Sequence, residues 1–146
     1  MTAQLLDGRS LAKTLKASLK EEVAAFAAAA GRAPTLAVIQ VAGDDASDWY
    51  VRAIKKSCES VGIAFEHQVL PETATQAEVE AAIRAASADA RLDGVLPQLP
   101  LPRHLDGEAA ILALDPRKDV DGLHPTNAGR LAQGLAALVP NTPAGG

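Results

Sequence analysis

The segment from residue 118 to 125, KDVDGLHP, gathers charge, tight turns and a histidine within a few positions. Asp119 and Asp121 lie two positions apart, so in an extended segment their side chains point the same way. Gly122 and Pro125 argue against a helix here. The same composition is also typical of an ordinary polar loop, so this segment alone leaves both interpretations open.

A second polar position, Gln98, begins the run QLPLP and follows a short apolar segment, residues 92–97, that predicts a strand. Tyr50 lies at the beginning of a predicted helix that follows another apolar strand, residues 35–41. Ligands of parallel sheets bind beyond the carboxyl ends of the strands. Gln98 and Tyr50 can therefore reach one rim of such a sheet.

Hydrophobic periodicity predicts the elements that position these residues. Leucines at i, i+4 spacing predict a long amphipathic helix at the start of the chain, and Asp45 or Ser47 can cap the second helix. The predicted helices cover residues 10–30, 47–61, 107–114 and 127–137, with another beginning at the capping-box sequence of residues 75–78, and the predicted strands cover residues 35–41, 63–70 and 92–97. Strands separated by helices imply right-handed parallel crossovers. We expect an α/β fold: a parallel sheet with helices on both faces, in a single domain.

Composition restricts the classes of function. The chain has 146 residues, 48% of them hydrophobic, which suits one domain with a sizeable core. Its net charge of −4 provides no basic surface for nucleic acid or an anionic membrane, and we expect neither partner. The single cysteine, Cys58, excludes an internal disulfide framework and is compatible with the cytoplasm. Three dispersed histidines give no metal-ligand spacing, so no metal is expected.

Two motifs at matching separation, residues 93–102 (DGVLPQLPLP) and residues 118–125, closely resemble the methylenetetrahydrofolate dehydrogenase/methenyltetrahydrofolate cyclohydrolase family. Shorter matches occur in the same order, at residues 7–8, 50–51, 61–63 and 140–143, where Asn141 replaces a cysteine common in the family. The resemblance covers the whole chain. It implies a folate-binding catalytic domain over residues 1–140 and, at residues 141–146, the start of a linker to a dinucleotide-binding domain that this chain lacks.

The resemblance implies tetrahydrofolate one-carbon interconversion, with the pterin ring stacked on Tyr50 and its amino-pyrimidine edge hydrogen-bonded to Asp121. A planar heterocycle suits an aromatic face, and its N–H donors suit an ionised carboxylate, which only accepts. Gln98 and Asp121 take the catalytic positions, and Pro100 and Leu101 join the substrate-binding residues. Without the resemblance, Tyr50 is equally consistent with an aromatic at the edge of the core, and Asp121 with a turn-capping carboxylate.

The chain departs from the family at one informative position. The resemblance implies a catalytic lysine four residues beyond Tyr50, tuned by Gln98, but Ile54 stands there. Lys55 and Lys56 follow at about 100° and about 200° of helical rotation from Ile54, which is typical of a solvated helix face. Water attack on the methenyl carbon requires a group that moves a proton, and isoleucine cannot do so. The cyclohydrolase step therefore loses the residue that it needs.

Hydride transfer requires NADP or NAD, which the resemblance assigns to the full-length enzyme. This chain has no Gly-x-Gly-x-x-Gly after a strand, so we expect it to bind no cofactor and to transfer no hydride alone. The resemblance also implies a homodimer. Two alternatives remain: a non-catalytic folate-binding or assembly module, and a relative repurposed for another substrate.

Overall fold

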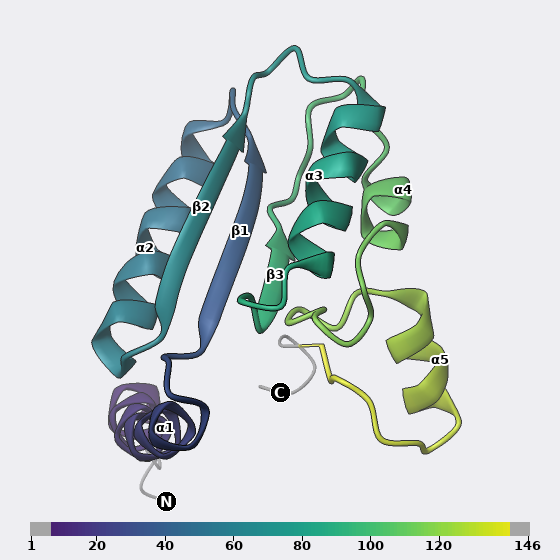
Figure 1. Cartoon of the computed structure of the whole chain (residues 1–146). Helices are drawn as coiled ribbons and strands as arrows, with labels where there is room; N and C mark the ends of the chain where they lie inside the picture. Colours follow the sequence, from purple (N-terminus) through teal and green to yellow (C-terminus); the bar gives the residue numbers. More distant parts are fainter. Residues whose placement is uncertain (1–6, 141–146) are drawn as a thin grey trace, which may run out of the picture.

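Three short segments form one parallel sheet in the computed structural model, which describes residues 7–140. The central strand β1 (Thr35–Val41) lies between β2 (Ala64–Leu70) and β3 (Gly94–Pro97). In register, Val38 lies opposite His67 on β2 and Leu96 on β3. Each crossover between strands contains a helix (Figure 1), which confirms the predicted parallel α/β fold.

The helices lie on both sides of this sheet, as predicted. They are α1 (Gly8–Ala30), α2 (Asp45–Val61), α3 (Gln76–Ala88), α4 (Gly107–Leu112) and α5 (Pro125–Ala132). In Figure 1, α2 covers one face of the sheet, while α3 and α4 lie on the opposite side. Because α2 begins where β1 ends, its first turn lies at the carboxyl edge of the sheet.

Helix caps explain where two of these helices begin. The N-cap of α2 is Asp44, whose Oδ2 accepts hydrogen bonds from the Ser47 backbone N–H at 3.0 Å and the Ser47 hydroxyl at 2.6 Å. The prediction of Asp45 or Ser47 as the cap is therefore wrong, by one position for Asp45 and by three for Ser47. The predicted capping box of α3 is confirmed, because Thr75 and Glu78 each bond the other's backbone N–H.

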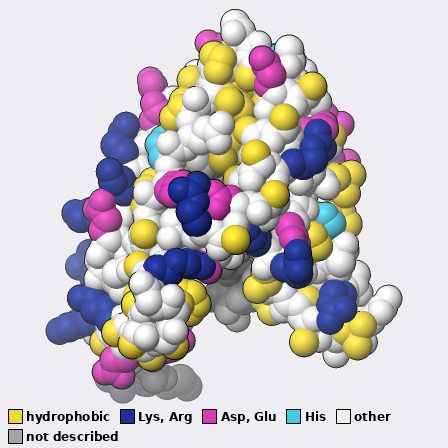
Figure 2. Space-filling view, viewed as in Figure 1, with side chains coloured by type: hydrophobic (Ala, Val, Ile, Leu, Met, Phe, Trp, Pro, Cys, Tyr) yellow, Lys and Arg dark blue, Asp and Glu magenta, His cyan; other side chains and the backbone are white. Residues whose placement is uncertain are grey.

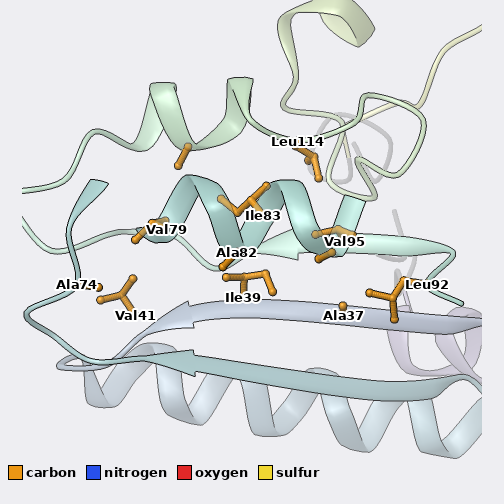
Figure 3. Packing of buried hydrophobic residues seen from close by; sticks show 12 residues of the cluster. Ala37, Ile39, Val41, Ala74, Val79, Ala82, Ile83, Leu92, Val95 and Leu114 are labelled. Atoms are coloured by element: carbon orange, nitrogen blue, oxygen red, sulfur yellow. The ribbon is translucent and has the colours of Figure 1, made fainter. Parts of the chain in front are cut away.

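The main core lies between β1 and α3, and Figure 3 shows its side chains meeting there. Ala37 and Ile39 on β1 pack against Ala82 and Ile83 on α3, together with Val95 on β3. Ile83 and Val95 are fully buried. Small and branched side chains let the helix approach the sheet closely, as the alanine-rich, aromatic-poor composition requires.

Helices α1 and α5 show the largest differences from the sequence prediction, while α4 ends two residues earlier than predicted. The leucine stripe of α1 exists, yet Leu11 and Leu15 are about 60% exposed (61% and 59%), and Val23 is the residue of α1 that is buried. α5 begins at Pro125, which suits the first helical position, and ends at Ala132 rather than 137. The reason is Gly134, whose left-handed backbone (φ 70°) terminates the helix and leaves Leu135 exposed instead of inward.

Within residues 7–140, no helix is long and apolar enough to cross a membrane. The predicted linker at residues 141–146, with Asn141, lies outside the described residues.

Candidate functional site

Four of the residues singled out in the sequence line one cavity of about 350 Å³: Tyr50, Ile54, Gln98 and Asp121. Its other described lining residues are apolar: Leu36, Leu96, Pro97, Leu99, Val120 and Leu123. The polar groups come from three segments that are far apart in the sequence. A largely apolar cavity with a few polar groups is typical of a site for a small organic molecule.

Helix α2 contributes Tyr50 and Ile54, which are four residues apart and so lie on one face. Val51 and Cys58 on the neighbouring face are buried and hold the helix to the sheet. Tyr50 remains 53% exposed, so one side of its ring is available to a ligand. An exposed aromatic face beside an apolar wall suits a flat heterocycle.

Gln98 follows the last residue of β3 and is buried. Its backbone N–H donates to the Ile39 carbonyl at 2.8 Å, which extends the β1 to β3 pairing by one bond. Its side-chain Nε2 donates to the Leu99 carbonyl at 2.7 Å. The Gln98 amide is therefore fixed in orientation where it meets the cavity.

Asp119 and Asp121 have different surroundings, because the chain turns at residues 120 and 121 and the segment is not extended. Asp119 is 1% exposed, and its carboxylate accepts from the backbone N–H groups of Leu123 (3.2 Å) and His124 (2.8 Å) and from Asn127 Nδ2 (2.8 Å). The chain turns between the two aspartates and closes on the Asp119 side chain. Asp119 holds the loop, while Asp121 lines the cavity.

The sequence does not predict the structural roles of Asp119 and Asn127, since the polar segment around them is equally consistent with a ligand site. The signal available was an aspartate followed within a few residues by a glycine turn, a pattern in which the carboxylate often bonds nearby backbone N–H groups. His124 is buried and caps α5, with its Nδ1 accepting from the Thr126 N–H at 3.1 Å. His124 therefore has a structural role in the loop, as the N-cap of α5.

Gly122 is the tightest point of the loop and yields a prediction about stability. Its φ is 68°, and an added Cβ would lie 2.6 Å from the Pro140 backbone nitrogen. We expect Gly122→Ala to lower the free energy of unfolding by about 2–4 kcal/mol, since left-handed strain adds to a clash with backbone that cannot yield cheaply. Urea denaturation measures this change.

Gly129→Ala is the matched control, because the position lies within α5 and has no atom within 4 Å of an added Cβ. Alanine is the better helix former, so this variant should be neutral or slightly more stable. Equal denaturation midpoints for the two variants would contradict the geometry described for the loop.

Pro100 and Leu101 lie elsewhere. They line a neighbouring cavity of about 420 Å³ beyond the end of β1, together with Gly43, Glu72 and Arg103 among others. Their predicted part in substrate binding stays a prediction.

The two lysines that follow Ile54 lie on the solvent side of α2. Lys55 is paired with Glu59 at 3.9 Å, and both side chains are more than half exposed. Figure 2 shows Lys and Arg side chains along the edge formed by α1 and α2. Burial lowers the pKa of His67 on β2, the nearby Asp48 charge opposes this shift, and the Lys55 charge adds to it. Neither Lys55 nor Lys56 lines the cavity among the described residues.

The helix N-terminus that directly follows β1 does not suit the pyrophosphate of a dinucleotide. The N-terminus of α2, directly after β1, carries the carboxylates of Asp44, Asp45 and Asp48. These charges repel phosphate where a dinucleotide site needs free N–H groups. The first turn of α3 is closed by its own capping box. Residues 7–140 also contain no cluster of His, Cys, Asp and Glu that could hold a metal ion.

A sequence profile described as tetrahydrofolate dehydrogenase/cyclohydrolase, catalytic domain, matches residues 6–121. The chain belongs to this family. The bifunctional protein FolD of Herpetosiphon aurantiacus is 64% identical over all 146 residues of the chain, which correspond to 51% of that protein. The chain thus spans about half the length of the curated relatives that it matches.

Solved structures of the tetrahydrofolate dehydrogenase/cyclohydrolase family share this fold. The FolD enzyme from Campylobacter jejuni superposes with a TM-score of 0.92 at 40% identity, covering 97% of this chain and 50% of that one. The Trypanosoma brucei enzyme, described as complexed with NADP cofactor and inhibitor, gives a TM-score of 0.89 at 33% identity, covering 99% of this chain and 50% of that one. The strand order and both helix layers are therefore those of the family.

Proposed function

We propose that this chain is the folate-binding half of a methylenetetrahydrofolate dehydrogenase/methenyltetrahydrofolate cyclohydrolase, with the pterin held in the cavity of Tyr50, Gln98 and Asp121. The observation that supports this most is the convergence of these three residues on one apolar cavity. Family membership supports the same substrate class.

Each polar residue has a distinct task in this proposal. The Tyr50 ring stacks on the pterin, and the Asp121 carboxylate accepts hydrogen bonds from its amino-pyrimidine edge. The Gln98 amide, fixed by its bond to the Leu99 carbonyl, meets the reacting end of the folate. The apolar wall around them excludes water from the ring.

The replacement of the family lysine by Ile54 affects the two reactions of the family differently. Tyr50 and Asp121 are the titratable groups among the described lining residues, and Asp121 is assigned to the pterin. No lysine therefore serves the water attack, and we propose that cyclohydrolase activity is strongly reduced. A nicotinamide cofactor accepts the hydride in the dehydrogenase reaction. Since the helix termini described above do not fit a dinucleotide, this chain contributes folate binding and orientation only.

Replacing Tyr50 by leucine tests the stacking role. We expect Tyr50→Leu to weaken binding of a tetrahydrofolate analogue by roughly 5- to 150-fold, because stacking of a base-like ring on an aromatic side chain contributes about 1–3 kcal/mol. Calorimetric titration measures the affinity.

The adjacent aromatic, Trp49, provides the control. It lies on the same helical turn, is 67% exposed and is not among the described lining residues. Trp49→Leu should bind the analogue as the parent does. An equal loss in both variants, or no loss in Tyr50→Leu, would contradict the assignment.

The proposal has two further features. A homodimer follows from the family resemblance, and a cytoplasmic location from the single cysteine.

A further inference from the structure

Gln40 is a buried amide on the central strand whose hydrogen-bonding partners come from two other elements. It is 1% exposed. Its Nε2 donates to Oδ1 of Asp48 on α2 at 2.6 Å, and its Oε1 lies 2.8 Å from Nε2 of His67 on β2. Burying an amide costs free energy unless its groups are paired, and here both ends are paired. We call these two hydrogen bonds the Gln40 bridge.

The chemistry of the partners sets the orientation of the bridge. An ionised carboxylate only accepts, so the amide nitrogen must face Asp48, which leaves Oε1 facing His67. His67 Nε2 must therefore donate. Burial lowers the pKa of His67, with the Asp48 charge opposing the shift and Lys55 adding to it. A neutral ring at pH 7 then carries its single proton on Nε2.

The bridge lies next to the residues that line the cavity. Asp48 belongs to the first turn of α2, two residues before Tyr50. Ile39, the residue before Gln40, accepts the Gln98 N–H at 2.8 Å. Two consecutive residues of β1 therefore hold the segments that carry Gln98 and Tyr50, one through its carbonyl and the other through its side chain.

The helix itself does not depend on the bridge. Its N-cap is Asp44, and its body is held by the buried side chains of Val51, Cys58 and Val61. Loss of the bridge should leave α2 formed and packed. What it frees is the first turn, which has no other side-chain bond to β1 among the hydrogen bonds of the described residues.

We propose that Gln40 is a positioning residue for the cavity. Through Asp48, its amide fixes the first turn of α2 and with it the Tyr50 ring. His67 keeps the amide in the orientation that serves Asp48. The inference rests on the proposed function, because the ligand that Tyr50 meets is taken to be a pterin.

The test compares Gln40→Leu, of similar size, and Asp48→Ala with Ile83→Val, which weakens the core on the opposite face of the sheet. We expect both bridge variants to speed hydrogen exchange of the first-turn amides of α2 about tenfold, since one hydrogen bond to a charged group is lost. Affinity for a tetrahydrofolate analogue should fall about five- to tenfold. Ile83→Val should lower the free energy of unfolding of the whole domain. It should leave the exchange rates of the first-turn amides of α2 and the affinity for the analogue as they are in the parent chain.

Two variants at position 67, His67→Gln and His67→Leu, test whether a hydrogen-bond donor is needed there. A glutamine amide can donate to Oε1 of Gln40, whereas leucine cannot. We expect parent-like affinity in the first and a loss in the second. Parent-like exchange and affinity in Gln40→Leu, or an affinity loss in Ile83→Val of the same size, would overturn the inference. If the parent fails to bind the analogue, the proposed function fails, while first-turn exchange still decides whether Gln40 positions the helix.

Discussion

Asp121→Ala is expected to reduce the affinity of this chain for a tetrahydrofolate analogue by roughly 10- to 150-fold. Hydrogen bonds to a charged group contribute about 1.5–3 kcal/mol, and about 1.4 kcal/mol corresponds to a factor of ten. The half-buried carboxylate lines a mostly apolar cavity, so water replaces it poorly as a partner for the pterin N–H groups. Calorimetric titration of parent and variant measures the difference.

Asp45→Ala is the matched control for charge, because it removes one carboxylate from an exposed position in the first turn of α2. It should bind as the parent does and share the parent's denaturation midpoint within experimental error. Parent-like binding by Asp121→Ala would remove this residue from the proposed site.

The variant Ile54→Lys is expected to hydrolyse methenyltetrahydrofolate about 10²- to 10⁴-fold faster than the parent chain. A positioned acid or base usually contributes a rate increase of this size. The new amine would enter a cavity lined largely by apolar side chains, which lowers a lysine pKa because burial disfavours the charged form. Its rate should rise with pH through that lowered pKa, as the amine becomes able to accept a proton. Loss of the methenyl absorbance measures the rate.

Two controls separate proton transfer from shape. Ile54→Met has similar volume and no titratable group, so it should remain as slow as the parent. Ile54→Lys combined with Lys55→Ala should keep the gained rate, because Lys55 lies on the solvent side of α2, paired with Glu59. If Ile54→Lys binds the analogue but hydrolyses methenyltetrahydrofolate no faster than Ile54→Met does, then position 54 is not where the cyclohydrolase residue is missing.

The strands and the longer helices could be predicted because periodicity and capping act over short stretches of sequence. The i, i+4 leucines of α1 and the Thr75 capping box are local signals, and both elements form as expected. The end of α5 could not be placed, since the apolar pattern continues past Gly134 while the backbone there turns left-handed. The exposure of Leu11 and Leu15 could not be predicted either. Periodicity predicts that one face of a helix is apolar but not whether another element covers that face.

The cavity followed from topology and from the family motifs, since both point to the same rim of the sheet. Long-range pairing was less visible in the sequence. Asp119 could be separated from Asp121 only once the loop was seen to close on it, and Gln40 reads as one polar residue in an apolar strand until Asp48 and His67 are placed beside it. Such contacts depend on the register of strands and helices, which residue spacing does not determine.

A nuclear magnetic resonance titration of the isotopically labelled chain with a tetrahydrofolate analogue shows where on the chain the analogue binds. We expect saturable shifts at the backbone amides of Tyr50, Gln98 and Asp121, with the opposite face of the sheet, around Ile83, unchanged. Shifts confined to another cavity, such as the one lined by Pro100 and Leu101, or no saturable shifts, would contradict a pterin site at Tyr50, Gln98 and Asp121.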